Sequence, residues 1–153
     1  RGDRIVSAKG TVIRTQSDFE SLMLDLMAGE PLSLYINGRV GTVTLVAEEL
    51  PSISADRVTA LEQMELVTVT LGIRTERNLR YDSGALIVAI ENDLEGRIGL
   101  REGDVILQIN RTTVTSAERA ADLLRRAVGN LTVYVERNGE VIVRQLVFRR
   151  SRV

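Results

Sequence analysis

The 153-residue sequence contains neither cysteine nor histidine. Without cysteine, the chain has no disulfide framework and no thiolate metal site. Without histidine, it cannot form a Ser-His-Asp or Cys-His catalytic site, a histidine-ligated zinc site or a histidine pH switch. We therefore expect no catalytic residue, no metal ligand and no cofactor within these residues.

Strong charge of one sign and long apolar runs are also missing. The 20 basic and 21 acidic residues leave a formal net charge of −1. This balance argues against a protein that binds nucleic acid or a membrane surface through bulk charge. No apolar run approaches the roughly 18–20 residues of a membrane-spanning helix. With 44% hydrophobic and 27% charged residues, the composition is typical of a soluble, core-forming protein.

An internal repeat is the most informative feature that is present. Residues 1–6 read like residues 102–107, with an offset of 101 between Gly2 and Gly103. The same offset places Thr15 opposite Ser116 and Met23 opposite Leu124. Both copies then reach an Asn-Gly pair, at Asn37-Gly38 and at Asn138-Gly139. So many features in one order indicate two related units.

The two copies share one expected local structure. Residues 104–109 alternate as a short buried strand. Thr115-x-x-Glu118 and Thr15-x-x-Asp18 have the spacing of a helix capping box. A helix of about twelve residues should follow each box and end near Gly129 or Gly29. A strand over residues 131–135 and a tight Asn138-Gly139 hairpin complete the second copy.

The second copy has more chain in front of it. We expect a strand over residues 66–70, a helical turn over 73–79, an apolar strand over 85–90 and a helical turn over 95–100. Strands dominate this order, and two helices cover the open ends of a small sheet. The predicted fold class is α+β, mainly β, with a partly open β-barrel or sandwich.

The first copy lacks a counterpart to residues 66–100. We expect residues 1–50 to be the back half of a domain whose front half lies upstream or comes from another chain, because about 50 residues bury too little surface. Pro51 should break the preceding strand. Residues 55–63 are predicted as a short helix capped by Ser54, so 51–63 form a semi-rigid helical connector. Residues 64–149 form the complete domain.

The segment Gly84-Ala85-Leu86-Ile87-Val88, followed by residues 96–110, resembles a bacterial PDZ domain. Its most specific element is Gly-Leu-x-x-Gly-Asp-Val-Ile-x-x-x-Asn, which runs from Gly99 to Asn110. The resemblance covers residues 64–148 in full, in the circularly permuted strand order of the bacterial families, and residues 2–46 resemble a second back half. Such a tandem is similar to the C-terminal region of HtrA-type serine proteases.

This resemblance implies a module that captures peptide C-termini or unfolded protein segments by strand addition. It implies that the fragment is non-catalytic, with a protease domain upstream, in the periplasm or cell envelope, and with a possible homo-oligomer. Two alternatives stay open. The module is part of a scaffold or secretion component without a protease, or it is a degenerate PDZ domain used for oligomer contacts.

The resemblance also implies the peptide-binding residues. Counting back from Gly84, the carboxylate-binding loop is Met64-Glu65-Leu66, followed by a groove strand that includes Val67, Thr68 and Val69. Glu65 stands where the family usually has Gly, and its carboxylate would repel a peptide carboxylate. The alternative loop is Leu71-Gly72-Ile73. From the long helix, Ala117, Ala121 and Leu124 are expected to face the groove. Asp104 is expected to accept from backbone amides, and Ser116 to cap a helix.

Overall fold

A computed structural model describes residues 2–148, which divide between Glu49 and Leu50 into two compact units. Residue 149, where we set the end of the complete domain, lies outside the described residues. Among the described residues, no helix is both long and apolar enough to cross a membrane.

The first unit is a four-stranded antiparallel sheet with one helix. Its strand order is β2-β1-β3-β4, and its small core contains Ala8, Leu32 and Leu34. Helix α1 buries none of its residues. The elements are β1 (Ile5–Ala8), β2 (Thr11–Val12), α1 (Gln16–Leu24), β3 (Pro31–Ile36) and β4 (Thr42–Val46).

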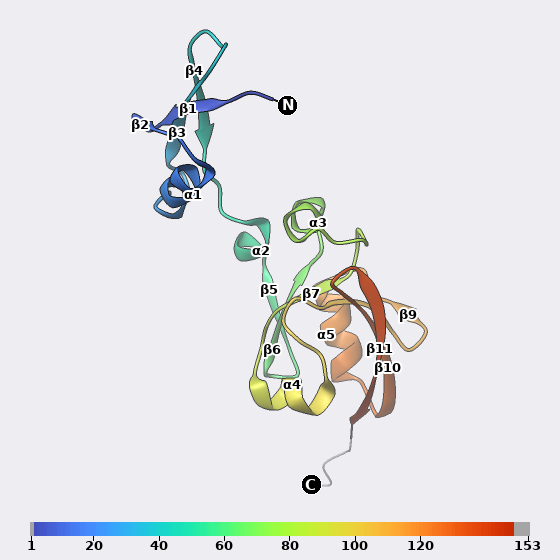
Figure 1. The fold of residues 1–153 in the computed structure, drawn as a ribbon. Helices are drawn as coiled ribbons and strands as arrows, with labels where there is room; N and C mark the ends of the chain where they lie inside the picture. Colours follow the sequence, from blue (N-terminus) through green and yellow to red (C-terminus); the bar gives the residue numbers. More distant parts are fainter. Residues whose placement is uncertain (1, 149–153) are drawn as a thin grey trace. The chain divides into compact units, whose positions relative to one another are not determined.

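The second unit is built on one open sheet with the order β11-β10-β8-β7-β6-β5, and β9 pairs with β8 (Figure 1). Its helices are α2 (Pro51–Ser54), α3 (Leu71–Arg77), α4 (Asn92–Ile98) and α5 (Ala117–Arg125). Its strands are β5 (Arg57–Ala60), β6 (Met64–Thr68), β7 (Ala85–Ile90), β8 (Val105–Ile109), β9 (Thr112–Thr113), β10 (Gly129–Arg137) and β11 (Glu140–Phe148).

Two apolar clusters lie on the two faces of this sheet. The larger packs α5 onto the strands through residues such as Leu66, Ile87 and Leu124. The smaller contains Val67, Val69, Ile73, Leu86 and Val105. Residues 66 and 67 fall in different clusters because successive side chains of a strand point to opposite faces.

Gly84 lets β7 approach β8 closely. Its φ is +139°, and a Cβ atom there would lie 2.8 Å from the carbonyl oxygen of Ile106. Both the backbone conformation and the close approach require glycine. The Gly84 carbonyl also accepts from the Val69 amide at 3.0 Å, which fixes the end of β6 beside the start of β7.

The repeat is visible in the topology. Strands β9-β8-β10-β11 repeat the order β2-β1-β3-β4, and α5 and α1 are both nine-residue helices. Their N-caps, Thr15 and Ser116, are 101 positions apart, as the sequence offset requires. Thr15 and Asp18 form the expected capping box. In the second unit the cap is Ser116 rather than Thr115, so the box predicted at Thr115 is wrong.

The mainly β fold class is confirmed, with five helices among the described residues, but the sheets are open and do not close into a barrel. The predicted connector helix over 55–63 is wrong. Only Pro51–Ser54 is helical, and Arg57–Ala60 is strand β5. The β-branched residues Val58 and Thr59 pair with β6, so tertiary pairing overrides local helix propensity.

The predicted helix ends need correction, whereas both Asn-Gly turns are present. Gly29 and Gly129 have positive φ, but they lie beyond the helix C-caps Asp25 and Arg126 and do not end the helices. Asn138-Gly139 forms the expected tight turn, with both φ values positive. Asn37-Gly38 also forms a turn, because the Arg39 amide donates to the Ile36 carbonyl at 3.2 Å, but here only Gly38 has positive φ and β4 begins later, at Thr42.

Candidate functional site

The candidate site is the groove between β6 and α5. The two elements meet where β6 ends and α5 begins, because the Thr68 hydroxyl accepts a hydrogen bond from the Ala117 amide at 2.9 Å. This bond satisfies one of the free amides at the helix N-terminus, and the Ser116 hydroxyl accepts another from Arg119 at 3.1 Å. The groove therefore has two walls that are tied together at one end.

The structure brings most of the predicted groove residues together. From β6, Met64 and Leu66 are buried in the same cluster as Ala117 and Leu124 of α5, and Ala121 packs at its edge. Val67 and Val69 lie elsewhere. They are buried in the cluster on the other face of the sheet, so their side chains pack away from α5.

Neither predicted loop is a loop. Met64, Glu65 and Leu66 belong to strand β6, where they pair with both β5 and β7. The alternative segment, residues 71–73, is the first turn of α3, and the Thr70 hydroxyl caps it by accepting from the Ile73 amide at 3.3 Å. The loop that precedes β6 is formed by residues 61–63.

Glu65 does not face a carboxylate-binding loop. Its carboxylate forms an ion pair with the guanidinium of Arg57 on the neighbouring strand, and 42% of its side chain is exposed. The expected repulsion between Glu65 and a peptide carboxylate therefore has no basis in the observed position of the residue.

The groove already contains an extended segment, β5. It pairs antiparallel with β6, with Ala60 opposite Met64 and Arg57 opposite Val67, and it contacts α5. Val58 and Ala60 join the α5 cluster, whereas Arg57 and Thr59 are exposed. Sequence reasoning missed this strand. The alternation of apolar Val58 and Ala60 with polar Arg57 and Thr59 was the available signal.

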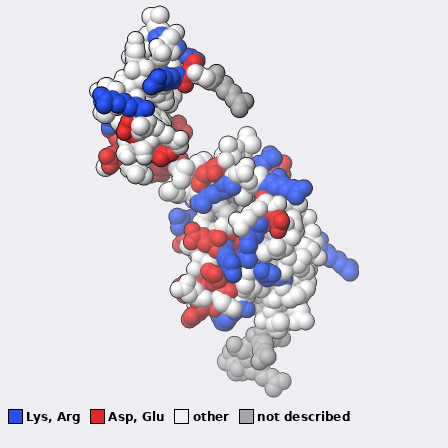
Figure 2. All heavy atoms as spheres, in the orientation of Figure 1, with Lys and Arg blue, Asp and Glu red and all other residues white. Residues whose placement is uncertain are grey.

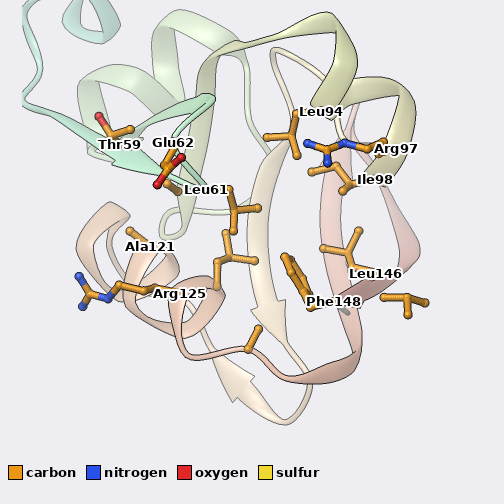
Figure 3. Close-up of a pocket in the computed structure, with 14 residues that line it drawn as sticks. Thr59, Leu61, Glu62, Leu94, Arg97, Ile98, Ala121, Arg125, Leu146 and Phe148 are labelled. Atoms are coloured by element: carbon orange, nitrogen blue, oxygen red, sulfur yellow. The ribbon is translucent and has the colours of Figure 1, made fainter. Parts of the chain in front are cut away.

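A cleft of about 890 Å³ opens at the end of the groove. Leu61 and Glu62 of the β5–β6 turn and Ala121 and Arg125 of α5 line one side (Figure 3). The opposite side is formed by α4 and β11, through Leu94, Arg97, Ile98, Leu146 and Phe148. The cleft is therefore apolar at its base, with arginines at its margin.

A buried ion pair holds the turn before β8. Asp104 is 1% exposed and accepts two hydrogen bonds from Arg137, both at 2.7 Å, and one from the Arg101 amide at 2.9 Å. The hydrogen bond to Asp104 raises the pKa of Arg137. The expected backbone contact of Asp104 is present, but its main partner is Arg137.

A second buried carboxylate, Glu136, was not predicted. Its two oxygens accept from the backbone amides of Arg80 and Tyr81 at 2.6 and 3.2 Å. This fixes the loop after α3 against β10.

Helix α2, which leads into β5, is anchored independently of the groove. The carboxylate of Glu76 on α3 accepts from the Ser52 amide at 2.8 Å and from the Ser52 hydroxyl at 2.6 Å. Burial raises the pKa of Glu76, but the hydrogen bonds from Ser52 and the charge of Arg77 outweigh it, so the pKa lies below its ordinary value.

The described residues contain no cluster of three or more acidic side chains that could hold a metal ion. On the face of the second unit seen in Figure 2, acidic and basic side chains are interspersed. The chemistry that the groove offers is therefore mainly backbone pairing and apolar contact, with Glu65 as a charged group on β6.

A family model and several known proteins match parts of the chain. Residues 69–136 match the model of the PDZ domain. A probable periplasmic serine endoprotease, DegP-like, of Pseudomonas putida is 27% identical over 142 residues, which cover 86% of this chain and 30% of the relative. A protein of the same name from Chlamydia trachomatis is 26% identical over 146 residues, with coverages of 92% and 29%. The chain thus spans about 30% of the length of these relatives.

One solved structure that resembles the chain is the HtrA3 PDZ domain bound to a phage-derived ligand, with a TM-score of 0.49 and 17% identity. The matched region covers 60% of this chain and 84% of the HtrA3 PDZ chain.

Proposed function

We propose that the second unit, a PDZ domain similar to those of HtrA-type proteases, captures extended peptide segments in the groove between β6 and α5. The observation that carries this proposal is β5 itself, because a strand in this position forms a ladder with β6 and packs apolar side chains on α5. A peptide bound by strand addition would use the same two contacts.

The larger setting is a multi-domain serine endopeptidase of the periplasm or cell envelope. This chain would supply substrate recognition, and a protease domain in the same protein would supply catalysis. The names of the DegP-like relatives support this setting. Peptide C-termini and unfolded protein segments are the proposed ligands.

The first unit is proposed to be the back half of a second PDZ domain. The repeated strand order supports this, as does α1, which buries no residue while its counterpart α5 buries three. Met23→Ala should change stability by less than about 1 kcal/mol in this chain and by about 2–5 kcal/mol when a front half is supplied, either by upstream residues or by another chain. An equally small effect in both cases would contradict the proposal.

A second candidate function follows from the same strand. If β5 fills the groove permanently, the domain serves as an interaction module, such as an oligomer contact, without a free peptide site. This reading also fits a scaffold or secretion component.

Chemical-shift mapping on the whole 153-residue chain tests peptide capture. Each peptide from a C-terminal library is compared with its C-terminally amidated twin. Shifts concentrated on β5, β6 and α5 are expected, and loss of these shifts on amidation identifies C-terminal recognition. Absence of shifts with every peptide, on a folded sample, would favour the interaction module.

A further inference from the structure

Strand β5 occupies the position that a captured peptide would need. Both edges of β6 are paired, one with β7 and the other with β5. We infer that β5 is an intramolecular occupant of the peptide groove, which an external segment of similar chemistry must displace. This inference rests on the proposed function, since it concerns the same groove.

The contacts of β5 are those of a ligand. Its backbone pairs with β6 over four residues, from Arg57 opposite Val67 to Ala60 opposite Met64. Its inward side chains, Val58 and Ala60, pack in the cluster that contains Leu124. A second strand cannot pair with this edge of β6 while β5 is present, because each edge of a strand supports one neighbour.

The turn that closes the β5–β6 hairpin destabilises the state in which β5 lies in the groove. Leu61 and Glu62 have φ values of 52° and 62°, in the left-handed region that disfavours residues other than Gly, Asn and Asp. The β10–β11 hairpin offers an internal comparison, because Asn138 and Gly139 have φ values of 52° and 80° and suit that conformation. The packing of the β5 side chains therefore has to offset the unfavourable backbone conformation of the turn at Leu61 and Glu62.

Release of β5 does not require the unit to unfold. Helix α2, on one side of it, is held by the Ser52 hydrogen bonds to Glu76. On the other side, β6 remains paired with β7. Gln63 is also held, because its carbonyl accepts from the Glu91 amide at 3.0 Å and its side chain forms hydrogen bonds with Glu91 and Arg97. Residues 55–62 can therefore leave the groove as a loop whose two ends stay fixed.

The occupant also indicates which external segments fit. Small or β-branched apolar side chains stand at alternate positions, as in Val58 and Ala60. Glu65 on β6 pairs with Arg57 and loses that partner when β5 leaves. The groove thus favours an extended segment with a basic residue next to Glu65, followed by an apolar residue, a polar residue and a small apolar residue.

A reversible disulfide between β5 and β6 tests whether β5 must leave the groove before a peptide binds. Because the chain has no cysteine, Thr59→Cys with Glu65→Cys introduces a single possible disulfide between residues directly opposite each other. The probe is a fluorescent peptide with the sequence of residues 57–61 and a free C-terminus. Oxidation should weaken its binding at least about tenfold relative to the same protein after reduction, since the open fraction sets the apparent affinity.

The opposite variant, Val58→Asn, removes an apolar contact of β5 and should strengthen peptide binding to the otherwise unchanged chain about tenfold. Equal binding by wild type and Val58→Asn, together with equal binding by the oxidised and reduced forms of the cysteine variant, would overturn displacement while leaving peptide capture intact. No binding by any form, including Val58→Asn, would overturn both proposals.

A charge-matched peptide tests the basic residue. Replacing the arginine of the probe by glutamate, with all other residues kept, should weaken binding to Val58→Asn about fivefold, in the range of an exposed cross-strand charge pair. Equal affinity of the two peptides would overturn the role assigned to Glu65.

Discussion

At the scale of single residues, the pair Asp104–Arg137 combines deep burial with complete hydrogen bonding. Three donors reach the two carboxylate oxygens of Asp104, and the Arg137 side chain is 18% exposed. Asp104→Asn removes the charge and leaves the guanidinium of Arg137 without its partner. We expect a loss of about 3–4 kcal/mol in the free energy of unfolding, measured in urea, because breaking a buried ion pair leaves one charge uncompensated.

The matched control is Asp122→Asn. Asp122 pairs with Arg125 and Arg126, whose side chains are each 76% exposed. Solvent screens such pairs, so the loss should be much smaller than that of Asp104→Asn. Equal decreases in the free energy of unfolding of the two variants would show that burial does not determine how much the Asp104–Arg137 pair stabilises the protein.

Glu62, in the β5–β6 turn, provides a second prediction at this scale. Glu62→Gly relieves the positive φ of 62°, and we expect the hairpin to gain about 0.5–1 kcal/mol, net of the greater backbone entropy of unfolded glycine. A firmer hairpin keeps β5 in the groove, so affinity for the residue 57–61 peptide should fall about threefold. Glu62→Ala, which removes the carboxylate but not the strain, is the control. Unchanged affinity in Glu62→Gly, with increased stability, would separate the turn from the groove.

At the scale of elements, the strands and turns with a strong local sequence pattern are the ones that the sequence predicts correctly. The apolar run Ala85–Ile90 coincides with β7, and the Asn138-Gly139 turn closes its hairpin as expected. Strand β5 had only the short alternation Arg57–Ala60 as a signal, and the ordinary helix formers of residues 55–63 outweighed it. The partner that makes Arg57–Ala60 a strand is the edge of β6, and a local pattern contains no information about that edge.

The candidate site was predicted unevenly for the same reason. The family resemblance implied Ala117, Ala121 and Leu124 as the groove face of the long helix, and in the structure Ala117 and Leu124 belong to the apolar cluster between α5 and the sheet, with Ala121 packed against it. The start of β6 was misplaced because Glu65 was read as a loop residue. Its ion pair with Arg57 depends on a strand pairing that spacing alone does not reveal.

The contact between α2 and α3 predicts a pH dependence. Because the pKa of Glu76 is lowered in the folded state, its contribution to stability is present above its ordinary value of 4.5 and is lost as pH falls through the lower folded pKa. Glu76→Gln should therefore destabilise the second unit by about 1–2 kcal/mol at pH 7, and the difference from wild type should shrink below pH 4.5.

Thermal unfolding of wild type and Glu76→Gln across pH 3–7 measures this difference. Glu102→Gln, at an exposed turn position, is the control and should follow wild type throughout. A difference between Glu76→Gln and wild type that is constant across the range would rule out titration of Glu76 as its cause.

At the scale of the whole molecule, the two repeated units differ in how much they bury. The second unit surrounds α5 with strands on two sides of a large cluster, whereas the described part of the first unit has only three fully buried apolar residues in its core. Its helix exposes Leu24 to 86%, and Met27, just beyond the helix, is 76% exposed. Since stability grows with the apolar area removed from water, the first unit of this chain should be the weaker one.

Hydrogen exchange measures that difference directly in the intact chain. Amides of β3 should exchange through frequent opening of the first unit, while amides of β7 and β8, which are interior strands of the second sheet, should need its global unfolding. We expect protection at Leu34 to be at least about a hundredfold lower than at Ile87 or Ile106, which corresponds to about 3 kcal/mol or more between the two opening equilibria. Similar protection of Leu34 and Ile87 would mean that the units unfold together, and that contacts within the first unit underestimate its stability.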